Sequence, residues 1–236
     1  AYRPFAVPAD VLALFDLDHT LVPRDSDEQW VEFLIDEGRI DADRFDAANR
    51  DLNARFNRGE ADTIEFAEFY LSTLTSIDDA TLRDLRERYL AQRIRPQILP
   101  AARELVARHR AEGHLCVITT AVIRFLSQSI AAEFGIEDVI ATEGERVEGR
   151  WTGRVAGATN TREGKVERLH QWLAARGQRL PEFREVWAYC DSMNDLPLMS
   201  IVTRPVAVNA DPVLAAHARH QGWPVANFAR ERREET

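Results

Sequence analysis

The feature that most constrains the fold is an unbroken apolar run, Val11 to Phe15, followed by two aspartates two positions apart, Asp16 and Asp18. A run of this length without alternation is typical of a strand in a parallel sheet that is buried on both faces. Asp16 then lies at the carboxyl end of that strand, where open α/β sheets bind their ligands. Two carboxylates at that point repel each other, and a divalent cation with oxygen ligands, Mg²⁺ above all, would offset the repulsion. The alternative for this stretch alone is a strand that ends in an aspartate-stabilised turn.

Composition sets limits on the size of the protein and on its partners. The chain has 236 residues, of which 45% are apolar, so it can bury a substantial core as one domain, with or without an insertion. Its formal net charge of −9 argues against a nucleic-acid partner, which needs a basic surface. A small phosphorylated metabolite remains compatible, because a metal ion and a few local cations suffice to bind one phosphate. Cys116 and Cys190 lie in apolar runs and are expected to be buried, reduced thiols.

The sequence carries no signal for a membrane. No stretch approaches 18 uncharged apolar residues, and the first ten residues lack the charge and apolar pattern of a secretory signal. We therefore expect a cytoplasmic protein without a membrane partner. Nothing in the sequence indicates its oligomeric state.

The segment between residues 24 and 95 is predicted to be all-helical. Amphipathic patterns begin near Asp25 and cover 41–56, 61–74 and about 78–95, with aspartates as candidate N-caps. Two parallel strands are normally joined by a crossover built on one helix, so four helices are too many. We interpret residues 24–95 as an inserted helical domain, and residues 1–23 and 96–236 as one α/β core domain.

An α/β pattern returns after Pro100. Buried strands are predicted over 115–118, 139–141, 186–190 and 205–208, with helices between them and a hairpin over 146–155. The expected fold is a Rossmann-like, mainly parallel sheet flanked by helices.

Polar residues follow several of these strands. Thr119 and Thr120 end one strand, Asp191 begins the run Asp191-Ser192-Met193-Asn194-Asp195 after another, and Lys165 lies in the first turn of a helix. Because the carboxyl ends of parallel strands meet at one edge of the sheet, we expect these groups to gather around Asp16.

Together these groups give the sequence a resemblance to the haloacid dehalogenase superfamily of phosphatases. Its Asp-x-Asp-x-Thr motif matches residues 16–20, its Thr or Ser after a strand matches Thr119, and its Lys matches Lys165. Its acidic pair after a further strand matches Asp191 and Asp195. The four motifs occur in the family's order. The helical insertion after the first motif resembles the cap of the phosphoserine-phosphatase-like branch.

This resemblance assigns roles that the chemistry supports. Asp16 is the candidate nucleophile that forms an aspartyl-phosphate, and Asp18 is the candidate acid and base that protonates the leaving alcohol and later activates water. Mg²⁺ would be bound by Asp16, by the backbone carbonyl of Asp18 and by Asp191, and would offset charge on the phosphoryl group.

Five further residues are expected to support the reaction. Thr119 would hold a phosphate oxygen and Lys165 would add a second cation. Asp195, with Ser192 and Asn194, would orient the metal's waters or Lys165. Taken singly, Lys165 could be an ordinary surface charge of its helix.

The substrate is less constrained than the reaction. The resemblance places an amine-binding acid soon after the first motif, and Asp25 matches it by position; Asp25, Asp27 and Glu28 could equally serve only to start a helix. Thr120 and Arg124 are further candidate substrate ligands, because Thr119 to Arg124 replaces the Ser-Gly-Gly run of phosphoserine phosphatases.

The carboxylate-binding arginine of phosphoserine phosphatases has no clear counterpart, with Arg55 and Arg58 candidates by location only. A phosphoserine-phosphatase-like activity is the first expectation. Histidinol phosphate or another amine-bearing phosphomonoester is the alternative, because neither requires a carboxylate clamp. A phosphoryl-accepting receiver module and a non-catalytic binding protein are remote alternatives. The first needs about half this length and no cap, and the second would not need to keep both Asp16 and Asp18.

Overall fold

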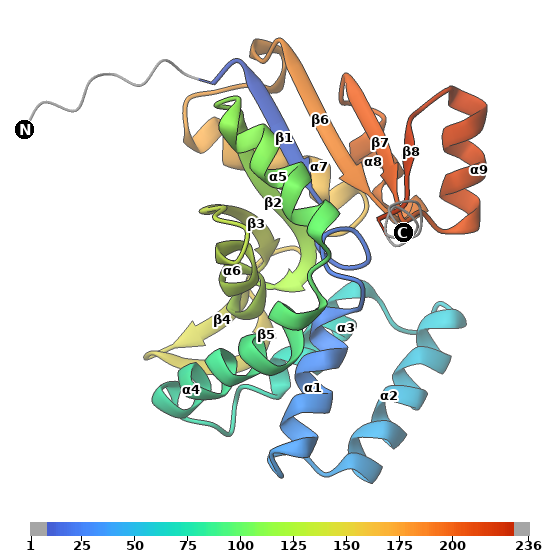
Figure 1. Cartoon of the computed structure of the whole chain (residues 1–236). Coiled ribbons are helices and arrows are strands. Elements are labelled where there is room, and N and C mark those ends of the chain that lie inside the picture. Colours follow the sequence, from blue (N-terminus) through green and yellow to red (C-terminus); the bar gives the residue numbers. More distant parts are fainter. Residues whose placement is uncertain (1–8, 229–236) are drawn as a thin grey trace, which may run out of the picture.

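The computed structural model describes residues 9–228, so the first and last eight residues of the expected core domain lie outside it. Its main sheet has six strands in the order β3-β2-β1-β6-β7-β8, and every neighbouring pair is parallel (Figure 1). This confirms the predicted α/β fold class. The strands are β1 (Val11–Phe15), β2 (Leu115–Ile123), β3 (Asp138–Thr142), β6 (Glu185–Cys190), β7 (Arg204–Val208) and β8 (Val225–Ala226).

Helices cover both faces of this sheet and explain the unbroken apolar run of β1. Ala13 and Phe15 belong to the buried cluster under α5 and α6, whereas Leu12 and Leu14 belong to the cluster under α7, α8 and α9. Each such side chain contributes roughly 1.5–3 kcal/mol by leaving water, which fixes β1 in the middle of the fold. The helices are α5 (Pro100–Ala111), α6 (Arg124–Ala132), α7 (Glu163–Ala175), α8 (Leu196–Met199) and α9 (Pro212–Gln221).

Residues 24–95, here called the cap, are all described, and they contain helices and no strand, as predicted. Each of the four helices begins at an aspartate whose side chain accepts a backbone N–H of the first turn, which explains where each one starts. A π-turn (Leu90–Ile94) and a 3-10 turn (Arg95–Gln97) lead on to α5. The helices are α1 (Ser26–Asp36), α2 (Ala42–Asn57), α3 (Thr63–Ser72) and α4 (Asp79–Tyr89).

The cap lies below the carboxyl ends of the strands, but it shares part of its core with the sheet domain (Figure 1). Trp30 of α1 and Tyr89 of α4 belong to the same buried cluster as Phe15, and the ring of Trp30 lies 5.8 Å from that of Phe125. The α1 helix follows β1 and α4 leads to α5, so both are tethered to the sheet. By contrast, α2 buries only Leu52 among its residues. The outermost helix of the cap is therefore α2, whereas Leu71 of α3 belongs to the shared buried cluster.

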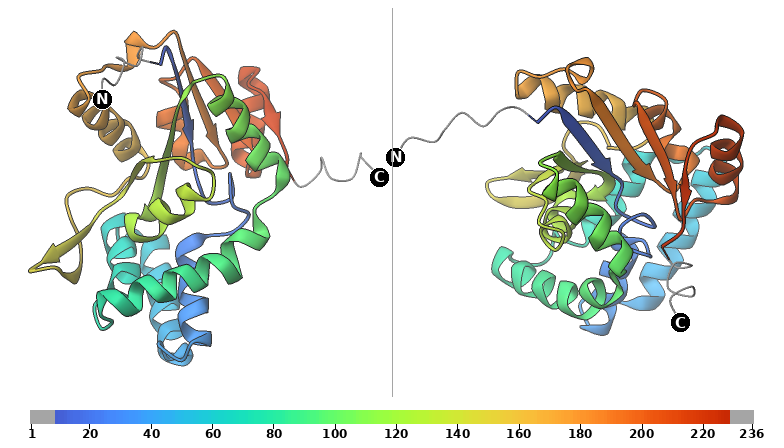
Figure 2. Two further views of the ribbon diagram at one scale, coloured as in Figure 1. Left: turned by 60° about the vertical axis from the view of Figure 1, so that its left-hand side comes forward. Right: turned by 45° about the horizontal axis from the view of Figure 1, so that its top comes forward.

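A two-stranded antiparallel hairpin, β4 (Gly144–Val147) and β5 (Arg150–Val155), leaves the sheet after β3. Figure 2 shows it projecting beyond the sheet beside the cap. The Glu68 carboxylate of α3 accepts the Val155 backbone N–H at 3.2 Å, which ties the cap to this hairpin. Both cysteines are buried free thiols, as predicted. Within residues 9–228, no helix has the length and apolar character needed to cross a membrane.

Candidate active site

The ends of β1, β2 and β6 and the start of α7 converge on a cavity of about 180 Å³ below the sheet. The loops after these strands and the first turn of the cap complete its walls. Side chains predicted from four separate parts of the sequence therefore meet here: the lining includes Asp16, Asp18, Asp25, Thr120, Lys165, Asp191, Ser192, Asn194 and Asp195.

Lys165 is the buried cation of this cavity. Its Nζ donates to Asp16 Oδ1 at 2.7 Å and to Asp195 Oδ2 at 2.8 Å, and its side chain is only 3% exposed. Burial alone would lower the pKa of Lys165, but the carboxylates of Asp16 and Asp195 outweigh it and raise the pKa. A lysine held between two carboxylates stays charged and fixes the Asp16 side chain in one position.

The start of α7 is shaped to deliver this lysine. Gly164 packs so closely on the preceding loop that an added Cβ would lie 2.5 Å from the carbonyl oxygen of Thr159. Only glycine fits there, and the close approach sets the first turn of α7 below the end of β1. Packing therefore explains the glycine in Glu163-Gly164-Lys165, which the charge pattern of this segment does not explain.

Three carboxylates at this edge could hold a divalent cation. Oxygens of Asp16, Asp191 and Asp195 lie within 4.8 Å of one another. Burial raises the pKa of Asp16 to about 8, in spite of Lys165. Burial, followed by the charge of Asp195, raises that of Asp191 to about 6. Such shifts mean that burial, and after it the neighbouring carboxylates, disfavour the ionised forms of these groups. A bound cation would favour those forms, and hard oxygen ligands of this kind suit Mg²⁺.

Asp18 is held by the cap. Its carboxylate accepts the hydroxyl of Ser26 at 2.5 Å and the backbone N–H of Ser26 at 3.0 Å. Burial, followed by the negative charge of Asp25, raises the pKa of Asp18 well above its ordinary value. A carboxyl group that keeps its proton near neutral pH is suited to act as a general acid. The contact of Ser26 with Asp18 was not predicted from the sequence. The only sequence signal was that Ser26 follows the capping aspartate at a recognisable helix start.

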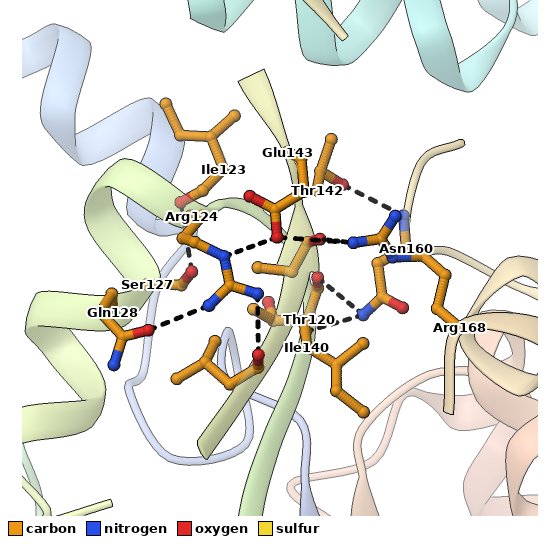
Figure 3. Close-up of polar contacts among 12 residues, drawn as sticks. Thr120, Ile123, Arg124, Ser127, Gln128, Ile140, Thr142, Glu143, Asn160 and Arg168 are labelled. Atoms are coloured by element: carbon orange, nitrogen blue, oxygen red, sulfur yellow. Dashed lines mark hydrogen bonds and ion pairs between the residues drawn. The ribbon is translucent and has the colours of Figure 1, made fainter. Parts of the chain in front are cut away.

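Thr119 and Thr120 lie within β2, which runs on to Ile123, and the two side chains are placed differently from the prediction. Thr120 lines the cavity, whereas Thr119 does not; Thr119 is buried and its hydroxyl accepts the side-chain amide of Asn160 at 3.1 Å. That amide also donates to the backbone carbonyls of Thr120 and Ile140, which binds the ends of β2 and β3 together (Figure 3). Asn160 is fully buried and was not predicted, because its role depends on two strands far from it in sequence.

Arg124 was predicted to bind substrate, and the structure places its side chain in contacts outside the cavity. Its guanidinium donates to Glu143 Oε1 at 2.5 Å, to Gln128 Oε1 at 2.9 Å and to the carbonyl of Val139 at 2.8 Å (Figure 3). It does not line the cavity. Arg124 therefore connects α6 to β3 and to the residue that follows it. Its position in the sequence, a few residues after Thr119 and Thr120, does not predict this structural role.

The remaining predicted residues fall into two groups. Ser192 and Asn194 line the cavity; the Ser192 hydroxyl accepts the Asn194 N–H at 3.0 Å and so starts a short 3-10 helix, Met193–Asp195, that positions Asp195. Asp25 caps α1 through the Glu28 N–H and also lines the cavity, so its two proposed roles are compatible.

Neither cap arginine named as a carboxylate ligand reaches the site. Arg55 pairs with Glu65 and Arg58 with Glu60, and neither lines the cavity. Glu28 does not line it either.

Comparison with known proteins agrees with this geometry. The model of the haloacid dehalogenase-like hydrolase family matches residues 13–200, which include all four motifs. The chain belongs to the haloacid dehalogenase-like hydrolases. It is a phosphatase of that family, as the relatives below also indicate.

Among curated relatives of this haloacid dehalogenase-like hydrolase, a histidinol-phosphatase of Neisseria meningitidis is 38% identical over 218 residues, which are 92% of this chain and 98% of that protein. The phosphoserine phosphatase SerB1 of Mycobacterium tuberculosis is 29% identical over 226 residues, 92% of this chain and 70% of its own. A crystal structure of a protein of unknown function from Bordetella pertussis superimposes with a TM-score of 0.90 at 43% identity, covering 93% of this chain and 99% of that one.

Proposed function

We propose that the protein is a Mg²⁺-dependent phosphatase that hydrolyses a small, amine-bearing phosphomonoester through an aspartyl-phosphate. The observation that supports the mechanism most is the arrangement of Asp16, a carboxylate at the end of β1 whose oxygen is fixed by Lys165 at 2.7 Å beside Asp191 and Asp195. A nucleophile that is already held in its reactive orientation loses little entropy on reaching the transition state, so the activation free energy of phosphoryl transfer is lower.

The chain's own residues account for both halves of the reaction. A carboxylate oxygen of Asp16 bonds to phosphorus as the bond to the substrate's alcohol oxygen breaks, and Asp18 transfers its proton to that oxygen. Asp18, now ionised, takes a proton from water, whose oxygen attacks phosphorus and releases phosphate and free Asp16. Lys165 and the backbone N–H groups in the last part of β2 would offset charge on the phosphoryl oxygens.

Mg²⁺ fits the carboxylates of Asp16, Asp191 and Asp195 by their chemistry, and it would supply a further positive charge to the phosphoryl group. The sequence prediction placed Asp195 outside the metal ligands. Both carboxylate oxygens of Asp195 contact Lys165 Nζ, at 2.7 and 2.8 Å, whereas Asp16 contacts it through Oδ1. This difference supports that division of roles, with Asp16 and Asp191 as the carboxylate ligands.

The metal should reveal itself in stability as well as activity. We expect EDTA to abolish turnover, Mg²⁺ to restore it, and Mg²⁺ to raise the melting temperature by mass action on the native state. Because protons compete with the metal for groups with pKa values of about 6 and 8, the rise should be larger at pH 8 than at pH 5.5. Differential scanning fluorimetry of the wild type and of Asp191→Asn measures this. An equal rise in the variant, or full activity in EDTA, would contradict the metal site.

The charge of the cavity favours an amine on the substrate and disfavours a carboxylate. Among the described residues that line it, the acids include Asp25 and Asp27, and Lys165, already paired, is the one lysine or arginine. The carboxylate of a substrate such as phosphoserine would be repelled by these acids, and the described lining has no arginine to offset the repulsion. The 38% identity to a histidinol-phosphatase over 98% of its length agrees with this. We therefore propose histidinol phosphate, the alternative that the sequence left open, ahead of phosphoserine.

A matched panel of substrates tests this choice. L-histidinol phosphate, L-phosphoserine, O-phosphoethanolamine and p-nitrophenyl phosphate are compared by kcat/KM with saturating Mg²⁺. We expect phosphoserine to be turned over at least about tenfold less efficiently than histidinol phosphate, the effect of leaving one buried charge unpaired. Equal or better turnover of phosphoserine would reject the substrate proposal and leave the phosphatase mechanism standing.

A further inference from the structure

A second cavity, of about 200 Å³, adjoins the first on its cap side. The two share Asp25, Asp27, Ala121 and Thr161 in their walls, so a substrate whose phosphate lies at Asp16 can extend its leaving group into the second cavity. We call this second space the leaving-group cavity. Its walls come from α1, α2 and α3 of the cap and from the ends of β2 and β3.

Aromatic side chains form the cap side of the leaving-group cavity. Phe56 of α2 and Phe66 of α3 meet edge to face, with ring centroids 4.9 Å apart, and Tyr70 lies one turn beyond Phe66. Phe56 and Phe66 are only partly buried, so they are not simply core residues of the cap. Aromatic faces and edges at such a site are suited to pack against a flat ring.

One carboxylate oxygen in this wall lacks a partner. Asp27 Oδ1 is buried without a hydrogen-bond donor among residues 9–228, although Asp27 lines both cavities. Burial, followed by the charge of Asp25, raises the pKa of Asp27 well above its ordinary value. Leaving such an oxygen unsatisfied costs stability, and buried polar atoms normally have a partner. A donor supplied by a ligand would satisfy it.

We propose that the leaving-group cavity binds a flat, nitrogen-bearing ring of the substrate, with Asp27 accepting a ring N–H and Phe56, Phe66 and Tyr70 packing against the ring. This inference rests on the proposed phosphatase function and deepens it by assigning the residues that would recognise the ring of the substrate. It divides the acids of α1 between two tasks. Asp25 binds the ammonium group, and Asp27 determines specificity for the ring.

The chain offers matched controls for both kinds of contact. Glu28 is an exposed acid next to Asp27 that lines neither cavity. Phe69 of α3 packs on Phe45 of α2 at 4.6 Å, a second aromatic pair between the same helices, and it lines neither cavity. Glu28→Gln and Phe69→Leu therefore repeat the chemical changes of Asp27→Asn and Phe66→Leu outside the proposed site.

The experiment measures kcat/KM of these four variants and of Asp25→Asn on L-histidinol phosphate, which has both ring and amine, and on O-phosphoethanolamine, which has the amine alone. Asp27→Asn and Phe66→Leu should lose about tenfold or more on the first substrate, mainly in KM, and less than twofold on the second. Asp25→Asn should lose on both substrates. The two controls should match the wild type. Phe66 is partly exposed, so its variant should fold even if Asp27→Asn does not.

Two outcomes would overturn the proposal in distinguishable ways. Equal losses on both substrates in Asp27→Asn and Phe66→Leu would mean that these residues only shape the cap, and the ring site would be rejected while the phosphatase activity stands. A wild type that prefers O-phosphoethanolamine to L-histidinol phosphate would reject the ring site and the proposed substrate together. Absence of turnover on every phosphomonoester, with native folding, would reject the proposed function itself. Calorimetric titration of the free alcohol L-histidinol would then still test the ring site, because binding weakened by Asp27→Asn supports it and no binding rejects it.

Discussion

Replacing Asp16 by asparagine is expected to lower kcat by at least about 10³-fold, because an amide is a poor nucleophile toward phosphorus and no other side chain can take its place. The fold should survive. Asparagine has nearly the same shape, and Lys165 keeps its contact with Asp195 at 2.8 Å. Burial, and after it the charges of Asp195 and Asp191, raise the pKa of Asp16 to about 8, so its ionised form is disfavoured in the folded protein and removing the carboxylate should not destabilise it. The melting temperature should therefore be unchanged or higher.

Steady-state rates on histidinol phosphate and on p-nitrophenyl phosphate, with the melting temperature of the same preparation, measure this effect. Acid quenching of the wild type during turnover should trap a phosphorylated protein, and the variant should give none. The sharpest control is Asp195→Asn, which removes an equally buried carboxylate that is not the nucleophile and should still trap the intermediate. An Asp16→Asn protein with a kcat within tenfold of the wild type would rule out the covalent mechanism.

Lys165→Met is expected to damage stability and activity together. The side chain of methionine is of similar length, but it leaves the buried carboxylates of Asp16 and Asp195 without their cation. Breaking a buried ion pair from one side typically costs 3–5 kcal/mol in the free energy of unfolding. Turnover should fall as well, because Asp16 loses the contact that fixes it and the phosphoryl group loses a positive charge.

The stability lost in Lys165→Met should depend on pH, and this dependence identifies unpaired carboxylates as its cause. Carboxyl groups whose pKa in the folded state lies above that in the unfolded state bind protons on folding, so they stabilise the protein as pH falls. The pKa of Asp16 is already raised to about 8 while Lys165 is present. Removing the positive charge of Lys165 raises the pKa of Asp16 further. The stability deficit of Lys165→Met should therefore be largest at pH 8 and shrink toward pH 5. Urea unfolding at several pH values measures it.

A double variant separates charge from packing in this prediction. Lys165→Met with Asp195→Asn leaves one unpaired carboxylate in place of two, so it should regain part of the lost stability without regaining activity. If the double variant were less stable than Lys165→Met at pH 8, unpaired charge would not be the cause of the loss. A deficit that is constant from pH 5 to pH 8 would lead to the same conclusion.

Much of the site could be predicted because its members lie next to strands with a clear pattern. The apolar runs before Asp16 and Asp191 can only be buried in a parallel sheet, and the sheet brings their ends together. Lys165 could be predicted as a site residue because it occurs at the place that the order of the family's motifs requires. The orientation of the two threonines could not be predicted, because the pairing of β2 with β3 shifts register between Thr119 and Ile123. That irregularity depends on a neighbouring strand.

By itself, the sequence determined the class of fold, the helical insertion at residues 24–95 and the aspartates at the ends of β1 and β6, because apolar periodicity and helix caps are local properties of the chain. The tertiary structure decided which polar groups face the cavity. It turned Arg124 to Glu143, set Ser26 against Asp18, and left Oδ1 of Asp27 without a donor among residues 9–228, beside the aromatic wall of α2 and α3. It also merged α1 and α4 with the buried cluster of the sheet domain. Each of these outcomes depends on a partner distant in sequence or on packing between separate elements, and the energy of such a contact exists only once the chain has folded.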